Sequence, residues 1–333
     1  MRGESAQPPQ ERKNLPAKET NGERIENGVW IPGSLAEFSQ DVAIGSTTKK
    51  LEQFALDEEP EKPTPRLRVT ADAKRVIDDR SALEEALKAS GNSASVDEYR
   101  GKKVVAGLIL GRLVKRLDPE ADLHRMIKTR LVHGKEIVLV DEAYLAQPKE
   151  KLASIVADGL ITQMEHIPLL VAAADCAPVF VYDPVTKSMG MFHSGYEGSI
   201  ARVSSRGIQQ MIEKFGSRIE DLRVVVGPHI DGAHYAVQNP LRERMQALQN
   251  EQGEPFYTPK EIEAMFITYP EHEGQISFDN GTAIKIEMEK LGIPASHVEV
   301  STISTAVNND FLPSNRIEGD KNRDSFMVAA VLK

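Results

Sequence analysis

The chain has 333 residues, of which 40% are hydrophobic, and it carries a formal net charge of −9 at pH 7. This is enough for one large folded domain or two ordinary ones, and the acidic balance argues against nucleic acid or an anionic membrane as a partner. No apolar run reaches the length of a membrane span, no hydrophobic leader follows Met1, and the single cysteine excludes an internal disulfide. We therefore expect a cytoplasmic monomer or homodimer that acts on a small molecule.

The beginning of the chain is polar and rich in proline. Residues 1–65 hold seven of the nineteen prolines among many Glu, Lys, Asn and Ser residues. Such a segment buries too little apolar surface to offset the entropy cost of ordering. The composition predicts a flexible tail over residues 1–34 and a single folded domain over residues 35–333, although the apolar run at 29–31 could dock on that domain.

Apolar residues at helical spacing predict a helix within residues 73–90, whereas the apolar stretch at 103–114 fits a strand or a buried helix equally well. Beyond residue 130 the periodicity is clearer. It predicts strands at 136–140, 167–176, 178–182, 188–193, 222–226, 298–300 and 326–332, and helices at 199–215, 240–250 and 283–291. Several of these strands are joined by connections too short for a crossover helix. The pattern therefore favours an α/β (α+β) fold with mixed sheets over a doubly wound parallel sheet.

Three residues of chemical interest stand where predicted strands begin or end. Cys176 closes an apolar run in Ala-Asp-Cys-Ala-Pro, His193 ends the strand at 188–193 and precedes Ser-Gly, and His133 lies in Leu-Val-His-Gly before the strand at 136–140. Each also has an ordinary structural interpretation. A single cysteine in an apolar run is often an unreactive residue of the core, and a single histidine is often a hydrogen-bonded structural residue. Functional sites, however, are commonly built at strand ends.

Taken together, these local sequences resemble the YfiH family, also described as polyphenol oxidoreductase laccase or multicopper oxidase type 4, which includes the laccase-domain purine nucleoside enzymes. The resemblance covers roughly residues 70–333 and is strong from 131 to 237. It is carried by an ordered series of motifs: Ala157-Asp158-Gly159-Leu160-Ile161-Thr162, Ala174-Asp175-Cys176-Ala177-Pro178, His193-Ser194-Gly195-Tyr196-Glu197-Gly198, Gly227-Pro228-His229-Ile230 and Tyr235-Ala236-Val237.

This resemblance implies a four-layer α/β/β/α sandwich and a zinc ion held by His133, Cys176 and His193. One thiolate and two imidazoles leave the fourth zinc position open for water. The family's activities are phosphorolysis of purine nucleosides, including methylthioadenosine, and deamination of adenosine. Multicopper oxidation is poorly supported, because it needs many histidines and the chain has eight, which are scattered.

The chain departs from the family pattern most clearly at Glu197, where the family motif has arginine. A carboxylate close to a bound phosphate disfavours phosphorolysis, while water attack on adenosine remains compatible with it. Glu197 is interpreted either as a residue that complements the dipole at a helix start or as a proton-transfer residue. Asp175 is the other candidate for proton transfer, or it orients a histidine from behind.

Five further residues are assigned to substrate binding: Tyr196, His229, His234, Tyr235 and Arg316. For the two histidines a solvated loop is the simpler interpretation, and for Arg316 a surface ion pair. The leading hypothesis is a zinc-dependent purine nucleoside enzyme that catalyses deamination, phosphorolysis or both. A metal-free cysteine hydrolase or deamidase using Cys176 and His193 is the first alternative, and a catalytically degenerate binding protein is the second.

Overall fold

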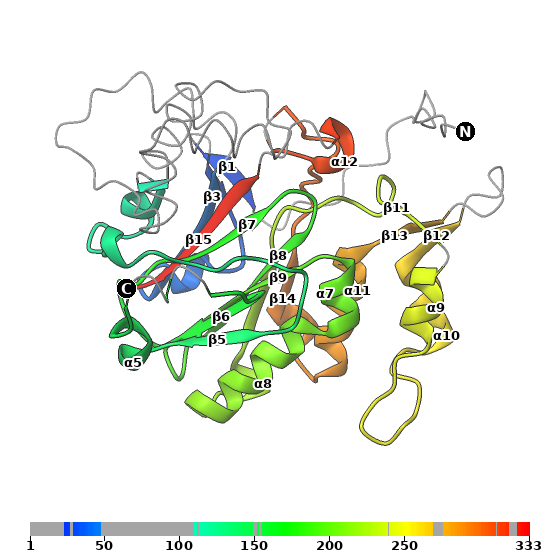
Figure 1. Ribbon diagram of the computed structural model, residues 1–333, viewed down its shortest axis with the longest axis horizontal. Helices are drawn as coiled ribbons and strands as arrows, with labels where there is room; N and C mark the ends of the chain where they lie inside the picture. The colour runs from blue at the N-terminus through cyan, green and yellow to red at the C-terminus, as the bar shows by residue number, and fades with distance from the viewer. Residues whose placement is uncertain are drawn as a thin grey trace.

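Two six-stranded β-sheets face each other across a shared apolar core in the computed structural model of the chain (Figure 1). The structure describes residues 23–26, 29–47, 110–111, 113–148, 152, 155–238, 240–268, 276–310, 312–319 and 325–333.

The first sheet joins strands from both ends of the described chain. Only the pair β4 and β7 is parallel, and every other pair of neighbours in this sheet is antiparallel. Its order is β1 (Arg24–Glu26), β2 (Val29–Ile31), β3 (Val42–Thr47), β15 (Phe326–Leu332), β7 (Leu169–Ala173) and β4 (Ile127–Lys128).

The second sheet is mixed and is built around a long hairpin. Strands β8 and β9 pair over seven residues, whereas the outer pairs β10–β14 and β5–β6 are parallel. Its order is β14 (Val298–Val300), β10 (Arg223–Val226), β8 (Ala177–Asp183), β9 (Ser188–Ser194), β6 (Gly159–Thr162) and β5 (Ile137–Val140).

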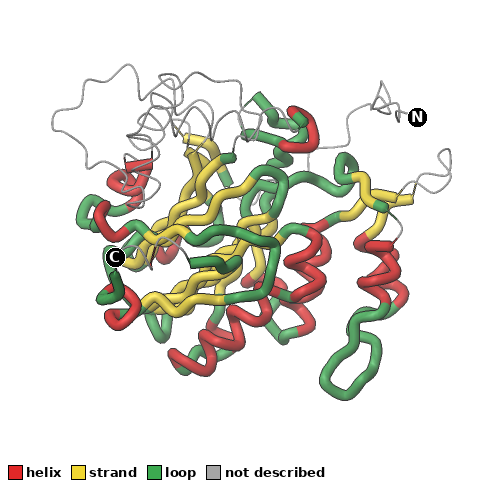
Figure 2. Tube along the Cα trace, in the orientation of Figure 1, coloured by secondary structure: helices red, strands yellow, loops and turns green. Residues whose placement is uncertain are grey.

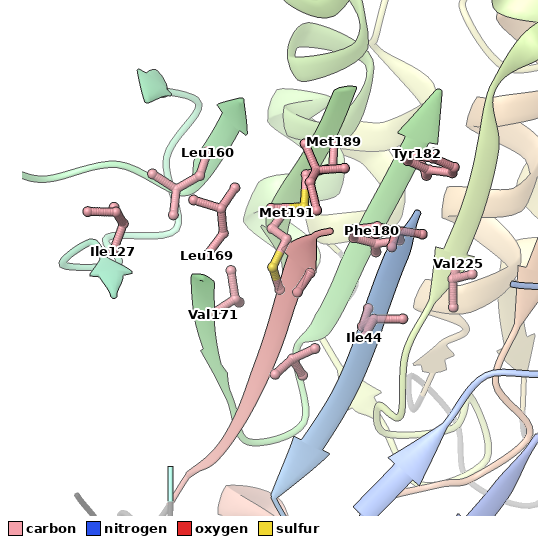
Figure 3. Packing of buried hydrophobic residues seen from close by; sticks show 14 of the residues in the cluster. Ile44, Ile127, Leu160, Leu169, Val171, Phe180, Tyr182, Met189, Met191 and Val225 are labelled. Carbon is pink, nitrogen blue, oxygen red and sulfur yellow. The ribbon is translucent and has the colours of Figure 1, made fainter. Parts of the chain in front are cut away.

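The strands at the centre are apolar throughout because both of their faces are buried. In β8, Phe180 and Tyr182 face the first sheet, while Val179 and Val181 face the helices on the opposite side. Successive side chains of a strand point to opposite faces, so a continuous apolar run fits a strand covered on both sides. Figure 3 shows Phe180, Met191 and Leu160 of the second sheet near Ile44, Val171 and Leu169 of the first sheet.

Helices cover the outer faces of both sheets (Figure 2). Helices α8 (Val203–Phe215) and α11 (Asn280–Lys290) pack on the second sheet, together with the short α7 (Tyr196–Ala201). The helical residues 110–111 and 113–117 pack on the first sheet, where Leu113 and Val114 lie in one cluster with Ala329 and Val331. The predicted four-layer α/β/β/α architecture is therefore confirmed.

A smaller unit, which the sequence did not predict, flanks the second sheet and forms its own apolar cluster. Its three-stranded sheet has the order β11 (Ala236–Val237), β13 (Ile276–Phe278) and β12 (Phe266–Thr268) and is accompanied by α9 (Pro240–Gln246) and α10 (Pro259–Met265). The remaining elements are α5 (Glu142–Leu145), α12 (Asn315–Glu318), η1 (Ala36–Phe38), η2 (Leu123–Arg125), η3 (Ile219–Asp221) and η4 (Ala295–His297).

The strands predicted beyond residue 130 are present, and two other predictions need correction. The helix predicted over 199–215 is two helices, because Arg202 adopts a left-handed conformation with φ 53° between α7 and α8. The ordered domain also begins earlier than the predicted boundary at residue 35, since residues 24–31 supply β1 and β2 and Trp30 is fully buried. The predicted helix within 73–90 and residues 1–22 of the predicted tail lie outside the described residues.

No helix in the described ranges combines the length and the apolar character needed to cross a membrane.

Candidate active site

His133 lies on a loop between β4 and β5 that is shaped by one buried carboxylate. Asp158, only 1% exposed, accepts hydrogen bonds from the backbone N–H groups of His133 at 2.9 Å and Gly134 at 2.8 Å. The backbone N–H of Val132 also points at it, at 3.2 and 3.3 Å from the two oxygens. This nest of donors holds His133 in a left-handed conformation with φ 57°, which is uncommon for residues other than glycine.

Cys176 lies in the tight connection between β7 and β8. Asp175, directly before it, has φ 84°, and its buried carboxylate accepts from Thr305 Oγ1 and Ser314 Oγ at 2.6 Å each and from the backbone N–H of Arg316 at 2.7 Å. The connection is therefore clamped to the segment before β15. Cys176 itself is partly exposed and is not disulfide-bonded.

His193 is the second-last residue of β9 and is 4% exposed. Its Nδ1 lies 3.2 Å from Asp158 Oδ1, which leaves Nε2 for the site. The turn that follows is fixed by Asn280, whose Nδ2 donates to the carbonyl of Ser194 at 2.7 Å and whose Oδ1 accepts from Ser199 Oγ at 2.6 Å. These buried hydrogen bonds stabilise the position in which β9 passes into α7.

The β8–β9 hairpin brings Cys176 against the end of β9. Ala177 pairs with Ser194, so the preceding cysteine lies beside Gly195. A Cβ atom on Gly195 would lie 2.5 Å from Cys176 Sγ and 3.5 Å from His133 Cδ2. Glycine is required here because a larger residue would occupy the space in which the thiol and the imidazole lie.

The three residues that the sequence singled out are thus brought together. Ligand atoms of His133, Cys176 and His193 all lie within 4.8 Å of one another, and the two imidazole rings meet edge to face with centroids 5.0 Å apart. Ligands that share a tetrahedral zinc ion are about 3.5 Å apart, so small side-chain rotations would bring these atoms to one ion. Within the described part of the chain this is the single group of this kind.

The electrostatics of the group favour a thiolate. Burial alone would raise the pKa of Cys176, but hydrogen bonds and positive charge from His133 and His193 lower it to about 7. Burial would lower the pKa of His193, but hydrogen bonds to Asp158 and Cys176 raise it to about 9. A divalent ion would replace the protons that these groups share, since metal ligands bind in their deprotonated forms.

Glu197 and Tyr196 begin α7 next to this group. The carboxylate of Glu197 forms a two-pronged ion pair with Arg244 of α9, at 2.8 and 2.6 Å. The Arg244 hydrogen bond lowers the pKa of Glu197, and positive charge on His133 contributes to the same shift, so the carboxylate is within electrostatic reach of the histidine. Tyr196 is 38% exposed.

The remaining predicted residues lie on or beside the loop after β10. His229 is buried, with Nδ1 2.8 Å from the carbonyl oxygen of Gly227, and His234 Nδ1 lies 2.7 Å from Asp231 Oδ2. Burial raises the pKa of Tyr235, and negative charge on Cys176 adds to this, which places the phenol near the thiol. The Arg316 guanidinium lies 5.4 Å from the Tyr235 ring centroid and donates to the carbonyl of Ala236 at 2.8 Å.

One predicted role changes in view of these contacts. Asp175 does not orient a histidine, because its carboxylate is bonded to Thr305, Ser314 and Arg316; Asp158 contacts His193 instead. Sequence reasoning recognised the motif that contains Asp158 without assigning the residue a role, although a carboxylate next to a buried strand was a usable signal. For Arg244, which lies 47 residues from Glu197, there was no local signal.

Comparison with known proteins supports the family resemblance that the sequence motifs indicated. The family model for multi-copper polyphenol oxidoreductase laccase matches residues 111–330. The chain belongs to this family. The family description implies a metal-binding protein, and the His-Cys-His group is of a kind that can hold a metal.

Two solved structures share the fold of this chain. A hypothetical protein YfiH from Bacillus licheniformis aligns with a TM-score of 0.63 and 22% identity, covering 94% of this chain and 100% of that protein. YlmD from Geobacillus stearothermophilus aligns with a TM-score of 0.64 and 19% identity, covering 92% of this chain and 96% of that protein. The resemblance to the YfiH family that the motifs indicated is confirmed.

Several proteins with sequences similar to this chain are named purine nucleoside phosphorylases. One from Bacteroides thetaiotaomicron is 27% identical over 191 residues, covering 57% of this chain and 67% of the relative. YlmD from Bacillus subtilis is 36% identical over 91 residues, covering 27% and 33%, and LACC1 from Mus musculus is 30% identical over 139 residues, covering 42% and 30%. The matched part of the chain thus spans about a third to two thirds of the lengths of these relatives.

Proposed function

We propose that the chain is a zinc-dependent enzyme that acts on purine nucleosides. The observation that carries this proposal is the convergence of one thiol and two imidazoles within 4.8 Å, in a family whose relatives are named purine nucleoside phosphorylases. A set of one sulfur and two nitrogen ligands suits zinc, and it leaves one position open. When bound, the ion would make a coordinated water available as a nucleophile near neutral pH.

The side chains around the three ligands would bind the nucleoside and move protons. Deamination of adenosine adds water at C6, protonates N1 and releases ammonia, so it needs a group that accepts and returns a proton. Glu197 is the proposed proton-transfer residue, because it stands at the start of α7 just after His193 and its carboxylate lies within electrostatic reach of His133. Tyr235 with Arg316 stacked on it, and Tyr196, would form the wall against which the purine binds.

The Glu197–Arg244 pair bears on the choice between water and phosphate as the nucleophile. Phosphorolysis must gather a phosphate dianion at the ribose, for which guanidinium groups are the usual partners. Arg244 supplies such a group, but both terminal nitrogens of its guanidinium already donate to Glu197. We therefore propose that water attack is favoured over phosphorolysis in this chain.

The metal-free cysteine enzyme remains the second candidate, because one specific observation favours it. The pKa of Cys176 near 7, set by contacts with His133 and His193, is typical of an activated nucleophile. In that mechanism the Cys176 thiolate attacks the substrate carbon and protonated His193 gives its proton to the departing amine. Water then cleaves the covalent bond to Cys176, releases the thiolate and returns a proton to His193. Asp158 would orient His193 in the way that a third residue orients the base in catalytic triads.

Metal analysis and turnover assays on the same protein sample test the proposal. We expect one equivalent of zinc in full-length protein purified without chelators, and conversion of adenosine to inosine without added phosphate. Inosine and methylthioadenosine, each with and without phosphate, measure phosphorolysis in parallel. Protein without metal whose Cys176 is rapidly alkylated would favour the cysteine enzyme, and no turnover of any nucleoside would favour a degenerate binding protein.

A further inference from the structure

Asp158 contacts two of the three residues of the site, and it does so in three ways. Its Oδ1 lies 3.2 Å from His193 Nδ1, and its own backbone carbonyl accepts from the N–H of His193 at 2.7 Å. Its two carboxylate oxygens also accept the N–H groups of His133 and Gly134. No ligand atom is contributed by Asp158 itself, so its influence on the site acts through the two histidines.

The position of Asp158 in the fold explains why one residue can reach both. It directly precedes β6, which lies between β5 and β9 in the second sheet. The loop carrying His133 leads into β5, and His193 lies near the end of β9. The backbone N–H of Asp158 is bonded to the carbonyl of Glu136 at 3.0 Å, which fixes the residue to the strand on the other side as well.

A carboxylate is required at this position. Each carboxylate oxygen of Asp158 accepts at least two N–H groups. Among these partners, only a deprotonated His193 Nδ1 could accept a hydrogen bond from an amide placed here. Asparagine would place an N–H₂ group against one set of donors and leave buried N–H groups unpaired, which is costly. The left-handed backbone of His133 depends on the same contacts, since a non-glycine residue there is strained unless the surrounding structure holds it.

We propose that Asp158 is the positioning residue of the site: it fixes the ring of His193 directly and the backbone of His133 through three N–H groups, so that both imidazoles face Cys176. This inference rests on the proposed function in one respect: it takes the group that the three residues bind to be a divalent metal ion. Groups that support metal-binding histidines from behind typically change metal affinity by 10- to 100-fold when they are removed.

Asp158→Asn tests the proposal, and the chain offers a matched control. Asp183 is also fully buried, lies at the far end of the β8–β9 hairpin and accepts the N–H groups of Val185 and Thr186 and the hydroxyl of Thr186. Asp183→Asn therefore removes a comparable set of hydrogen bonds without touching the site. Cobalt(II) is the probe, because its affinity is measured by chelator competition and its visible spectrum reports the thiolate ligand and the geometry around the ion.

We expect D158N to bind cobalt about 10- to 100-fold more weakly than wild type with an altered spectrum, and D183N to bind with wild-type affinity and spectrum. Equal binding by D158N and wild type would overturn the proposal. An equal loss in both variants would also overturn it, because the effect would then come from the fold as a whole.

A second measurement is independent of metal binding. In metal-free wild-type protein, the Nδ1 proton of His193 bonded to Asp158 should give a downfield imidazole N–H signal by NMR, and this signal should be lost in D158N and kept in D183N. Its persistence in D158N would refute the positioning role. If wild type binds no cobalt, the proposed metal function fails, and this NMR comparison still decides the role of Asp158.

Discussion

Glu287 is a buried carboxyl on α11, and the effect of replacing it on the free energy of unfolding can be predicted in size. It is 1% exposed, and Ser205 of α8 provides its hydrogen-bonding partners, through the hydroxyl and through the backbone N–H at 3.1 Å. Burial raises the pKa of Glu287 from its ordinary value of 4.5 to about 7, although Ser205 and the charge of Arg202 oppose the shift. The folded state therefore prefers the neutral acid.

The sign and size of the effect follow from that shift. A carboxyl whose folded pKa is raised costs nothing below the unfolded pKa, and its cost grows as the pH rises until it is complete above the folded pKa. Moving the pKa of Glu287 from 4.5 to about 7 corresponds to about 3 kcal/mol of lost stability above pH 8. Glu287→Gln is neutral at every pH and keeps an oxygen for Ser205.

We expect Glu287→Gln to raise the free energy of unfolding by up to about 3 kcal/mol at pH 8, and to have little effect near pH 4. Thermal melts at both pH values measure this, with an expected rise in Tm at pH 8 of roughly 6 °C. Glu289→Gln, at an exposed position on the same helix, is the control for loss of a negative charge. The reasoning is refuted if Glu287→Gln is less stable than wild type at pH 8, or if its gain is the same at both pH values.

Three further predictions concern the site. Gly195→Ala should weaken cobalt binding at least about tenfold, because the new Cβ would lie 2.5 Å from Cys176 Sγ; unchanged affinity in chelator competition would contradict this. The alkylation rate of Cys176 in metal-free protein should reach half its maximum near pH 7 and fall when zinc is added, since His133 and His193 lower the pKa of the thiol; a midpoint near 9 would be inconsistent with this geometry. Glu197→Gln should release Arg244 and lower the KM for phosphate in inosine phosphorolysis by roughly tenfold, whereas an unchanged KM would show that the pair does not govern phosphate binding.

The architecture was predictable because its signals are local. Buried strands such as β8 and β9 are continuous apolar runs bounded by turn residues, and the end of α8 at Gly216 follows from the left-handed conformation with φ 72° that glycine adopts readily. The break between α7 and α8 was missed because Arg202 carries no sequence signal for such a conformation. Short strands such as β11 and β4 have two residues each and take their identity from their partners.

The site was predictable in its three central residues and not in the residues around them. His133, Cys176 and His193 stand in family motifs, and their convergence was an inference from resemblance that the described geometry now supports. The pairing of Glu197 with Arg244 depends on how α9 packs beside α7, which follows from tertiary structure and not from spacing. The interpretation of Asp175 as the residue that orients a histidine was wrong, because only the fold shows that its carboxylate is bonded to Thr305 and that Asp158 faces His193.

The family model begins at residue 111, yet the folded unit reaches back to Glu23. The Glu23 carboxylate accepts from Trp30 Nε1 at 3.0 Å and from Ser301 Oγ and the Thr302 backbone N–H at 2.6 Å each. Strand β3 pairs with β15 from residue 328 to residue 332. A protein trimmed to the matched region would expose the hydrogen-bonding edge of β15 along with apolar surface, a combination that promotes aggregation. Recombinant work on this protein should therefore retain the residues upstream of the shared region, because they complete the sheet that packs against the strands carrying Cys176 and His193.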